Sequence, residues 1–178
     1  MHILQDLEPA KVFSYFEKIC SIPHTSFHEK QLSDYCVAFA KDHNLYYEQD
    51  NIGNVLIVAD ATPGYENEPA LMIQGHMDMV AVKKPGSPID MTTEGLQLAV
   101  DGDYVFAKDT SLGGDDGIAV AYALAILDAK DIPHPRLEVI ITVDEETGME
   151  GANGIDLSMC KSHQMINLDN EEEGVLLT

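Results

Sequence analysis

The sequence predicts an α/β fold, a three-layer α/β/α sandwich with a mostly parallel central sheet. Amphipathic helical patterns alternate along the chain with apolar runs of strand length. Residues 137–143 form a continuous run rich in β-branched side chains, which is typical of a central strand covered on both faces. The chain has 178 residues, enough for one domain with a full core.

Two helices are expected near the N-terminus. Apolar side chains recur with helical spacing over residues 9–20, and Pro9 suits the first turn of that helix. Ser26 and Glu29 have the spacing of a capping box, in which both side chains close the first turn of a helix. The apolar stripe of this second helix follows at Leu32, Tyr35, Cys36 and Phe39.

Paired strands come next. Residues 46–50 and 54–59 resemble two strands of a hairpin. Residues 70–74 form an apolar strand, and a second small hairpin is expected over residues 96–107, where Asp101-Gly102 is a turn signal.

The second half continues the alternation. Gly113-Gly114 opens a helix over residues 118–127 that is apolar on nearly all sides and should be buried. After the central strand, residues 145–154 form a glycine-rich loop or short helix, and residues 165–168 a further short strand.

Composition excludes several classes of partner. The formal net charge of −21 should repel nucleic acid and anionic membranes, so we expect neither as a partner. No apolar run approaches the length of a membrane span, and the N-terminus lacks the pattern of a signal peptide. The three cysteines have no metal-type spacing and are interpreted as buried thiols of a cytoplasmic protein: Cys20, Cys36 and Cys160.

Acidic and histidine side chains gather where the buried elements begin or end. In open α/β sheets, ligands bind beyond the carboxyl ends of the strands. If the strands are parallel, these side chains converge on one edge of the sheet. They are His76, Asp78, Asp115, Glu145, Glu146 and Asp169.

Such a set is suited to divalent metals. Imidazole with carboxylates fits zinc, manganese or cobalt better than copper or an iron–sulfur cluster. Two metals sharing a carboxylate would activate a water near neutral pH. Asp78 could orient His76 or lie beside the metal. Of the adjacent Glu145 and Glu146, one would bind metal and the other would shuttle a proton.

Each cluster also has a structural interpretation. Asp115-Asp116 could complement the dipole of the following helix, and we prefer this reading for Asp116. The acidic run at 171–173 reads as solvated surface. His24 and His28 are expected at the surface or in caps, and His134 in a turn. Four clusters at corresponding ends of buried elements nevertheless argue against coincidence.

Four motifs resemble those of the cocatalytic di-zinc metallopeptidases related to glutamate carboxypeptidase and peptidase T, and among them the aminoacyl-histidine (Xaa-His) dipeptidases of the peptidase D type. The resemblance covers essentially the whole chain. The motifs are GHMDMV at 75–80, TSLGGDDG at 110–117, TVDEETGM at 142–149 and NLDNEEEG at 167–174.

The resemblance implies four metal ligands. His76 and Asp169 would bind the first zinc, Glu146 the second, and Asp115 would bridge both. Two zinc ions are implied per complete site, with cobalt or manganese as possible replacements.

The resemblance also implies a reaction. Asp78 would orient His76, and Glu145 would be the general base in the hydrolysis of small Xaa-His dipeptides such as carnosine-like substrates. A related aminoacylase, tripeptidase or carboxypeptidase stays an alternative, as does a non-catalytic fragment that binds metal.

The family pattern extends beyond this chain. It includes a further metal-binding histidine and a lid domain, and none of the seven histidines here has the context of that ligand. We therefore expect residues 1–178 to be the N-terminal part of a catalytic domain, without the lid and the C-terminal part. The fragment itself should bind metal weakly and show little or no activity, and the whole enzyme should be a homodimer.

Overall fold

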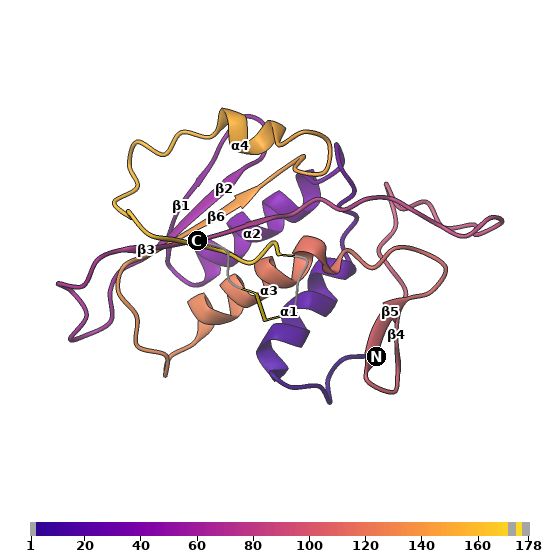
Figure 1. The fold of residues 1–178 in the computed structure, drawn as a ribbon, viewed down its shortest axis with the longest axis horizontal. Helices are drawn as coiled ribbons and strands as arrows, with labels where there is room; N and C mark the ends of the chain where they lie inside the picture. The colour runs from indigo at the N-terminus through magenta and orange to yellow at the C-terminus, as the bar shows by residue number, and fades with distance from the viewer. Residues whose placement is uncertain (1–2, 171–173, 176–178) are drawn as a thin grey trace.

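The computed structural model describes residues 3–170 and 174–175 (Figure 1). The acidic run at 171–173 lies outside the described residues. The helices are α1 (Ala10–Cys20), α2 (Lys30–Asp42), α3 (Gly114–Asp128) and α4 (Glu150–Gly154). The strands are β1 (Tyr46–Gln49), β2 (Val55–Ala59), β3 (Leu71–His76), β4 (Leu98–Asp101), β5 (Tyr104–Ala107), β6 (Leu137–Thr142) and β7 (Met165–Asn167). The predicted α/β fold is confirmed.

The main sheet has the strand order β1-β2-β6-β3-β7 over the described residues. Strand β3 pairs in parallel with β6 and β7, whereas β2 pairs antiparallel with β1 and β6. All strands except β2 therefore run in one direction, in agreement with a mostly parallel sheet. Strand β6 is central and wholly buried, as its sequence predicts. Strands β4 and β5 form the predicted hairpin as a separate two-stranded sheet.

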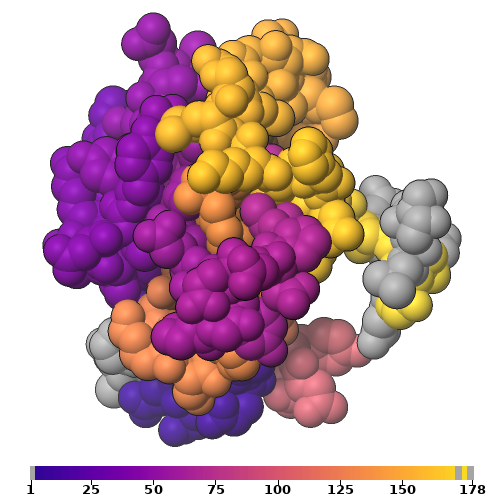
Figure 2. All heavy atoms as spheres, turned by 90° about the vertical axis from the view of Figure 1, so that its left-hand side faces the viewer, coloured from indigo at the N-terminus to yellow at the C-terminus, as the bar shows by residue number. Residues whose placement is uncertain are grey.

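The two faces of the sheet are covered unequally. Helices α1, α2 and α3 enclose the larger core, with α1 and α3 below the sheet in Figure 1. On the other face, Ile155, Met159 and Cys160 pack on a small cluster that includes Met72 and Ile140. Figure 2 shows this orange-to-yellow segment lying against the purple β1–β2 region. The three layers are present, but one of them is a helix of five residues followed by irregular chain.

Glycine at position 75 lets α3 approach β3 closely. A Cβ atom at Gly75 would lie 2.7 Å from Asp116 Oδ2 and 2.9 Å from Ala119 Cβ, so a larger residue has no room. Helix α3 is buried on most sides, as predicted, because it packs between α1 and β3. This packing brings the start of α3 to the end of β3, where the candidate site forms.

Helix α2 begins differently from the sequence prediction. It starts at Lys30 with Glu29 as its N-cap residue, and no side-chain hydrogen bond caps it. The predicted capping box is therefore wrong. The Ser26 hydroxyl donates instead to Asp78, and the Glu29 carboxylate accepts from the backbone N–H of Asp144. Both side chains therefore bond to residues that are distant in the sequence instead of to the first turn of α2.

A buried carboxylate in β6 anchors the chain that leads to β7. Glu138 accepts hydrogen bonds from Arg136 Nε at 2.8 Å, from the Lys161 N–H at 2.9 Å and from the Ser162 hydroxyl at 2.6 Å. Burial alone would raise the pKa of Glu138, but these hydrogen bonds lower it to about 2. The central strand thereby fixes the segment after α4.

Two smaller expectations can be compared with the structure. The three cysteines are free thiols; Cys20 and Cys36 are buried, and Cys160 is partly buried. Among the helices of the described residues, none combines the length and the apolar character needed to span a membrane.

Candidate metal centre

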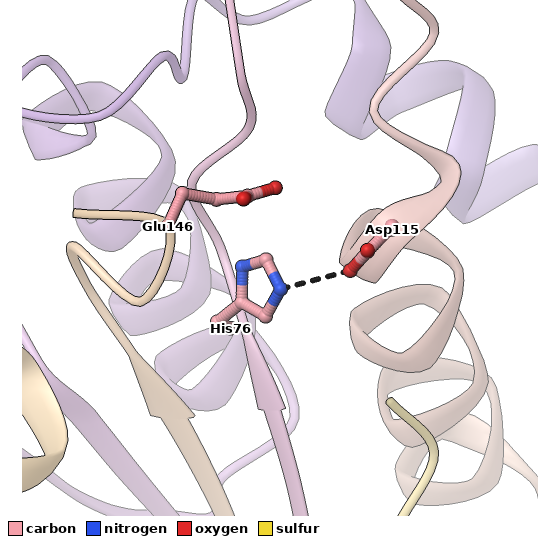
Figure 3. A group of neighbouring side chains, drawn as sticks. All are labelled: His76, Asp115 and Glu146. Carbon is pink, nitrogen blue, oxygen red and sulfur yellow. Dashed lines mark hydrogen bonds and ion pairs between the residues drawn. The ribbon is translucent and has the colours of Figure 1, made fainter. Parts of the chain in front are cut away.

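The predicted site residues meet at one edge of the sheet. Parallel strands β3 and β6 end side by side, so His76 at the end of β3 lies next to the Glu145-Glu146 loop that follows β6. Asp115 enters from the start of α3, and Asp169 follows β7. Figure 3 shows the side chains of His76, Asp115 and Glu146 pointing toward one another from three separate segments.

The Nε2 atom of His76 is the centre of this arrangement. It lies 3.0 Å from Asp115 Oδ1 and 3.8 Å from Glu145 Oε2. Two groups each have their ligand atoms within 4.8 Å of one another: His76 with Asp115 and Glu146, and His76 with Glu145 and Asp169. The imidazole is 1% exposed and the Asp115 side chain 63% exposed, so the carboxylates form a rim above a buried ring.

Asp78 contacts the opposite side of the imidazole. Its carboxylate lies 3.2 Å from His76 Nδ1, and its backbone carbonyl lies 3.0 Å from the same atom. A proton on Nδ1 is thus held by Asp78, which leaves Nε2, on the side of the rim carboxylates, as the ring nitrogen available to a metal. Asp78 therefore contacts the ring nitrogen that faces away from the rim carboxylates.

The carboxylate of Asp78 also holds the acidic loop. Asp78 Oδ1 accepts from the Glu145 N–H at 3.0 Å, and Oδ2 accepts from the Glu146 N–H at 3.3 Å and from the Ser26 hydroxyl at 2.8 Å. Burial would raise the pKa of Asp78, but the hydrogen bonds from His76, Glu145 and Ser26 hold it below its ordinary value. One buried carboxylate therefore sets the relative positions of the imidazole and both glutamates.

The electrostatics of the site favour a bound cation. Burial alone would lower the pKa of His76, but Asp78 and its acidic neighbours outweigh burial and raise that pKa to about 9. Burial and the negative charge of Asp115 raise the pKa of Glu146. A divalent ion would relieve the same crowding of carboxylates, and one imidazole with several carboxylates is a donor set that suits such an ion. The residues present fit a metal.

Asp116 differs from its sequence interpretation. It does not simply complement the helix dipole, since its side chain is buried beneath the site and Oδ2 accepts from the backbone N–H of His76 at 3.2 Å. Burial raises the pKa of Asp116 to about 7 against the opposing effect of His76. The signal that could have identified it is Gly75, a glycine within an apolar strand, which marks a close approach by another group.

His24 also differs from its sequence interpretation. The ring is 2% exposed rather than at the surface, and Nδ1 lies 2.6 Å from the Ile22 carbonyl. Its Nε2 atom has no hydrogen-bond partner among the described residues and lies 3.2 Å from where a Cβ of Gly113 would be. His24 thus packs under the turn that carries Asp115. His28 is exposed and His134 lies in a loop, as expected.

A hollow of about 260 Å³ adjoins the rim carboxylates. It lies between the start of α3 and the segment after β7, and Ile118 and Leu168 give it an apolar wall beside Asp115 and Asp169. Space of this kind next to a metal-binding edge could hold part of a small substrate.

The chain is similar over nearly its whole length to known peptidases. It is 43% identical over 174 residues to the cytosol non-specific dipeptidase of Escherichia coli (strain K12), covering 98% of this chain and 36% of that protein. It matches the crystal structure of an aminoacylhistidine dipeptidase from Vibrio alginolyticus with a TM-score of 0.93 and 43% identity, covering 96% of this chain and 35% of that chain. The resemblance predicted from the motifs is confirmed.

A more distant structure shares the fold. A tripeptidase from Staphylococcus aureus subsp. aureus Mu50 matches with a TM-score of 0.74 at 21% identity, over 90% of this chain and 43% of that chain. No protein-family model matches the chain. The chain spans about a third of the length of the dipeptidases that it matches.

Proposed function

We propose that this chain forms the metal-binding edge of a two-metal dipeptidase whose substrates include aminoacyl-histidine dipeptides. The observation that carries the proposal is the convergence of rim carboxylates on His76 in two overlapping groups. The similarity to a non-specific dipeptidase and to an aminoacylhistidine dipeptidase supports the substrate class. A cytoplasmic location and a homodimeric whole enzyme belong to the same proposal.

Four residues would hold the metals. His76 and Asp169 bind one ion, Glu146 binds the other, and Asp115 is shared. Zinc is the preferred metal for this donor set, with cobalt and manganese as alternatives. When bound, such a pair supplies Lewis acidity toward a peptide carbonyl and lowers the pKa of a water molecule.

Glu145 is the proposed general base. Its carboxylate is 3.8 Å from His76 Nε2 without accepting a hydrogen bond from it, and its backbone is fixed by Asp78. Glu145 takes a proton from water as the carbonyl is attacked and donates it to the leaving amine. Asp78 keeps His76 in one tautomer throughout.

The described residues hold only part of the proposed enzyme, in keeping with the share of the relatives that they cover. A further histidine ligand and a lid domain complete the site in this proposal. The 178 residues by themselves then bind metal weakly and turn over dipeptides slowly or not at all.

The central experiment is Glu145→Gln in the complete enzyme of which these residues form part. We expect dipeptide hydrolysis to fall by about 100- to 10,000-fold, the contribution of a general base, while the zinc content measured by elemental analysis stays unchanged. Unchanged turnover in this variant would refute the base assignment.

A non-catalytic metal-binding protein is the alternative from another class. Calorimetric titration of the complete enzyme with Zn²⁺ separates the two proposals. Two tightly bound ions support a competent peptidase, whereas one weak ion or none supports the alternative.

A further inference from the structure

The loop between α1 and α2 carries side chains that the proposed reaction does not use. Ser26 and Glu29 have the spacing of a capping box, yet no side chain caps α2. Both side chains turn toward the edge of the sheet, where they contact the two loops that form the metal centre.

Ser26 is joined to the loop that follows β3. Its hydroxyl donates to Asp78 Oδ2 at 2.8 Å, and its backbone N–H donates to the Met79 carbonyl at 3.4 Å. Thr25 and Met79 form an isolated parallel bridge beside this contact. Because Asp78 holds His76 Nδ1 and the Glu145 and Glu146 amides, the Ser26 hydroxyl acts on the residue that positions these three residues of the site.

The next residues of the loop are joined to the segment that follows β6. The Phe27 N–H donates to Asp144 Oδ1 at 2.8 Å, and Glu29 Oε1 accepts from the Asp144 N–H at 3.2 Å. Asp144 directly precedes Glu145, so these bonds fix the start of the acidic loop, and the carboxylates of Glu29, Asp78 and Asp144 have oxygen atoms within 4.8 Å of one another.

These contacts carry local costs. An absent side-chain cap forfeits about 1 kcal/mol of helix stability. Phe27 has φ of 66°, in the left-handed region that bulky residues rarely adopt, and its side chain is 69% exposed. Burial raises the pKa of Glu29 to about 7, and the neighbouring Asp144 adds to the shift. Unfavourable features gathered in one short loop are typical of a segment that serves a functional site.

We infer that Ser26 and Glu29 are positioning residues that brace the Asp78 loop and the Asp144–Glu146 loop against each other, and so fix the spacing of the metal ligands. The metal part of this inference rests on the proposed function. The bracing part rests on the hydrogen bonds alone and can be tested without metal.

The first test is amide hydrogen exchange of the metal-free protein. In Ser26→Ala we expect the Glu145 and Glu146 amides to exchange about tenfold faster or more, because Asp78 loses a partner that holds it under them. The matched control is Ser21→Ala, which removes an exposed hydroxyl bonded to the Lys18 carbonyl. Equal exchange at these amides in the two variants would overturn the inference.

Zinc affinity provides a second readout. Loss of a residue that orients a metal site typically weakens metal binding by about 10- to 100-fold, and we expect this for Ser26→Ala but not for Ser21→Ala. A lower melting temperature of Ser26→Ala with unchanged exchange and zinc affinity would indicate only a structural role and overturn the inference. If the complete enzyme binds no zinc, the proposed function fails, and the exchange experiment still tests whether Ser26 and Glu29 hold the two loops together.

Glu29 is tested by a pair of variants. Glu29→Gln keeps an oxygen that can accept from the Asp144 N–H, whereas Glu29→Ala removes it. We expect the Glu145 amide to exchange about tenfold faster in Glu29→Ala and at the parent rate in Glu29→Gln. If the Glu145 amide of Glu29→Ala exchanges at the parent rate, Glu29 does not help to hold the two loops together.

Discussion

Strands β3 and β6 on one side, and β7 on the other, lead to the proposed metal ligands, and they differ in how firmly the rest of the protein holds them. Strand β3 ends at a buried His76 and is followed by a buried Asp78, and its neighbour β6 is buried throughout. Strand β7 leads to Asp169, yet all three of its residues are exposed and it pairs only with β3 among the described strands. The inner side of the site, at the ends of β3 and β6, is built into the core. The outer side, at the end of β7, depends on a few hydrogen bonds.

This difference separates proposed ligands that are positioned by packing from proposed ligands that are positioned by local hydrogen bonds. On the inner side, a change at one residue should disturb several ligands at once, because they share Asp78. On the outer side, a change should affect Asp169 alone. The four predictions below compare the two sides, from the largest expected effect to the smallest.

The largest effect is expected for Asp78→Ala. The substitution removes the acceptor of the Glu145 and Glu146 amides and the carboxylate beside His76 Nδ1, which keeps only the backbone carbonyl of residue 78. We expect zinc affinity to fall by about 100-fold and the free energy of unfolding to fall by about 1–3 kcal/mol. Titration calorimetry and urea unfolding measure the two quantities. Asp156→Ala, at an exposed aspartate that accepts a hydrogen bond from the Ser158 N–H, is the control and should leave zinc affinity unchanged.

Gly75→Ala tests the packing beneath the inner side. The added methyl group meets Asp116 and Ala119 at distances that require α3 or β3 to shift. Overpacking of this kind costs about 1–3 kcal/mol, which urea unfolding should detect. Gly114→Ala is the matched control, since its nearest neighbour is 3.8 Å away, and its stability should stay close to that of the parent. Equal stability of the two variants would show that the close approach of α3 is not needed.

The inner side was also the part most open to prediction from the sequence. An apolar run precedes His76-Met77-Asp78, and another precedes Glu145. These runs predict strands with polar residues at their carboxyl ends, which is where open α/β sheets bind ligands. The structure brings all the predicted site residues together. The sequence does not identify Asp116 as part of the site, because the helix dipole already explains an acidic residue at the start of a helix.

The capping box shows a different limit of sequence reasoning. Ser26 and Glu29 have the right local spacing, but their partners Asp78 and Asp144 lie 52 and 115 residues away along the chain. A local sequence pattern does not show which distant loop will compete with the helix end for the hydrogen bonds of these side chains. The burial of His24 differs from its predicted place at the surface or in a cap for a similar reason, because the Gly113 turn that covers it is distant along the chain.

Acid should loosen the outer side through Glu138. The pKa of Glu138 is lowered to about 2 in the folded protein by its hydrogen bonds. A depressed pKa means that protonation favours the unfolded state, so this stabilisation is present above the ordinary glutamate pKa of about 4.3 and is lost as the pH falls toward 2. Urea unfolding between these pH values should show a steeper loss of stability in the parent than in Glu138→Gln. Identical slopes would show that Glu138 does not anchor the chain before β7.

The smallest effect is expected for Asn167→Ala, at the end of β7. The Asn167 side chain accepts from the Asp169 N–H at 3.1 Å and donates to the Gln74 side chain of β3. These bonds are exposed, so removing them should cost about 0.5–1.5 kcal/mol, or roughly a two- to tenfold loss of zinc affinity.

The Asn167→Ala variant tests whether the inner and outer sides of the site are held independently. Asn167→Ala should leave the exchange of the Glu145 and Glu146 amides at the parent rate, because Asp78 and Ser26 still hold that loop. If its zinc affinity falls as far as that of Asp78→Ala, the outer side is as firmly coupled to the site as the inner one. A small loss confined to zinc binding would instead mean that Asp169 adds its bond to a site already ordered by β3 and β6.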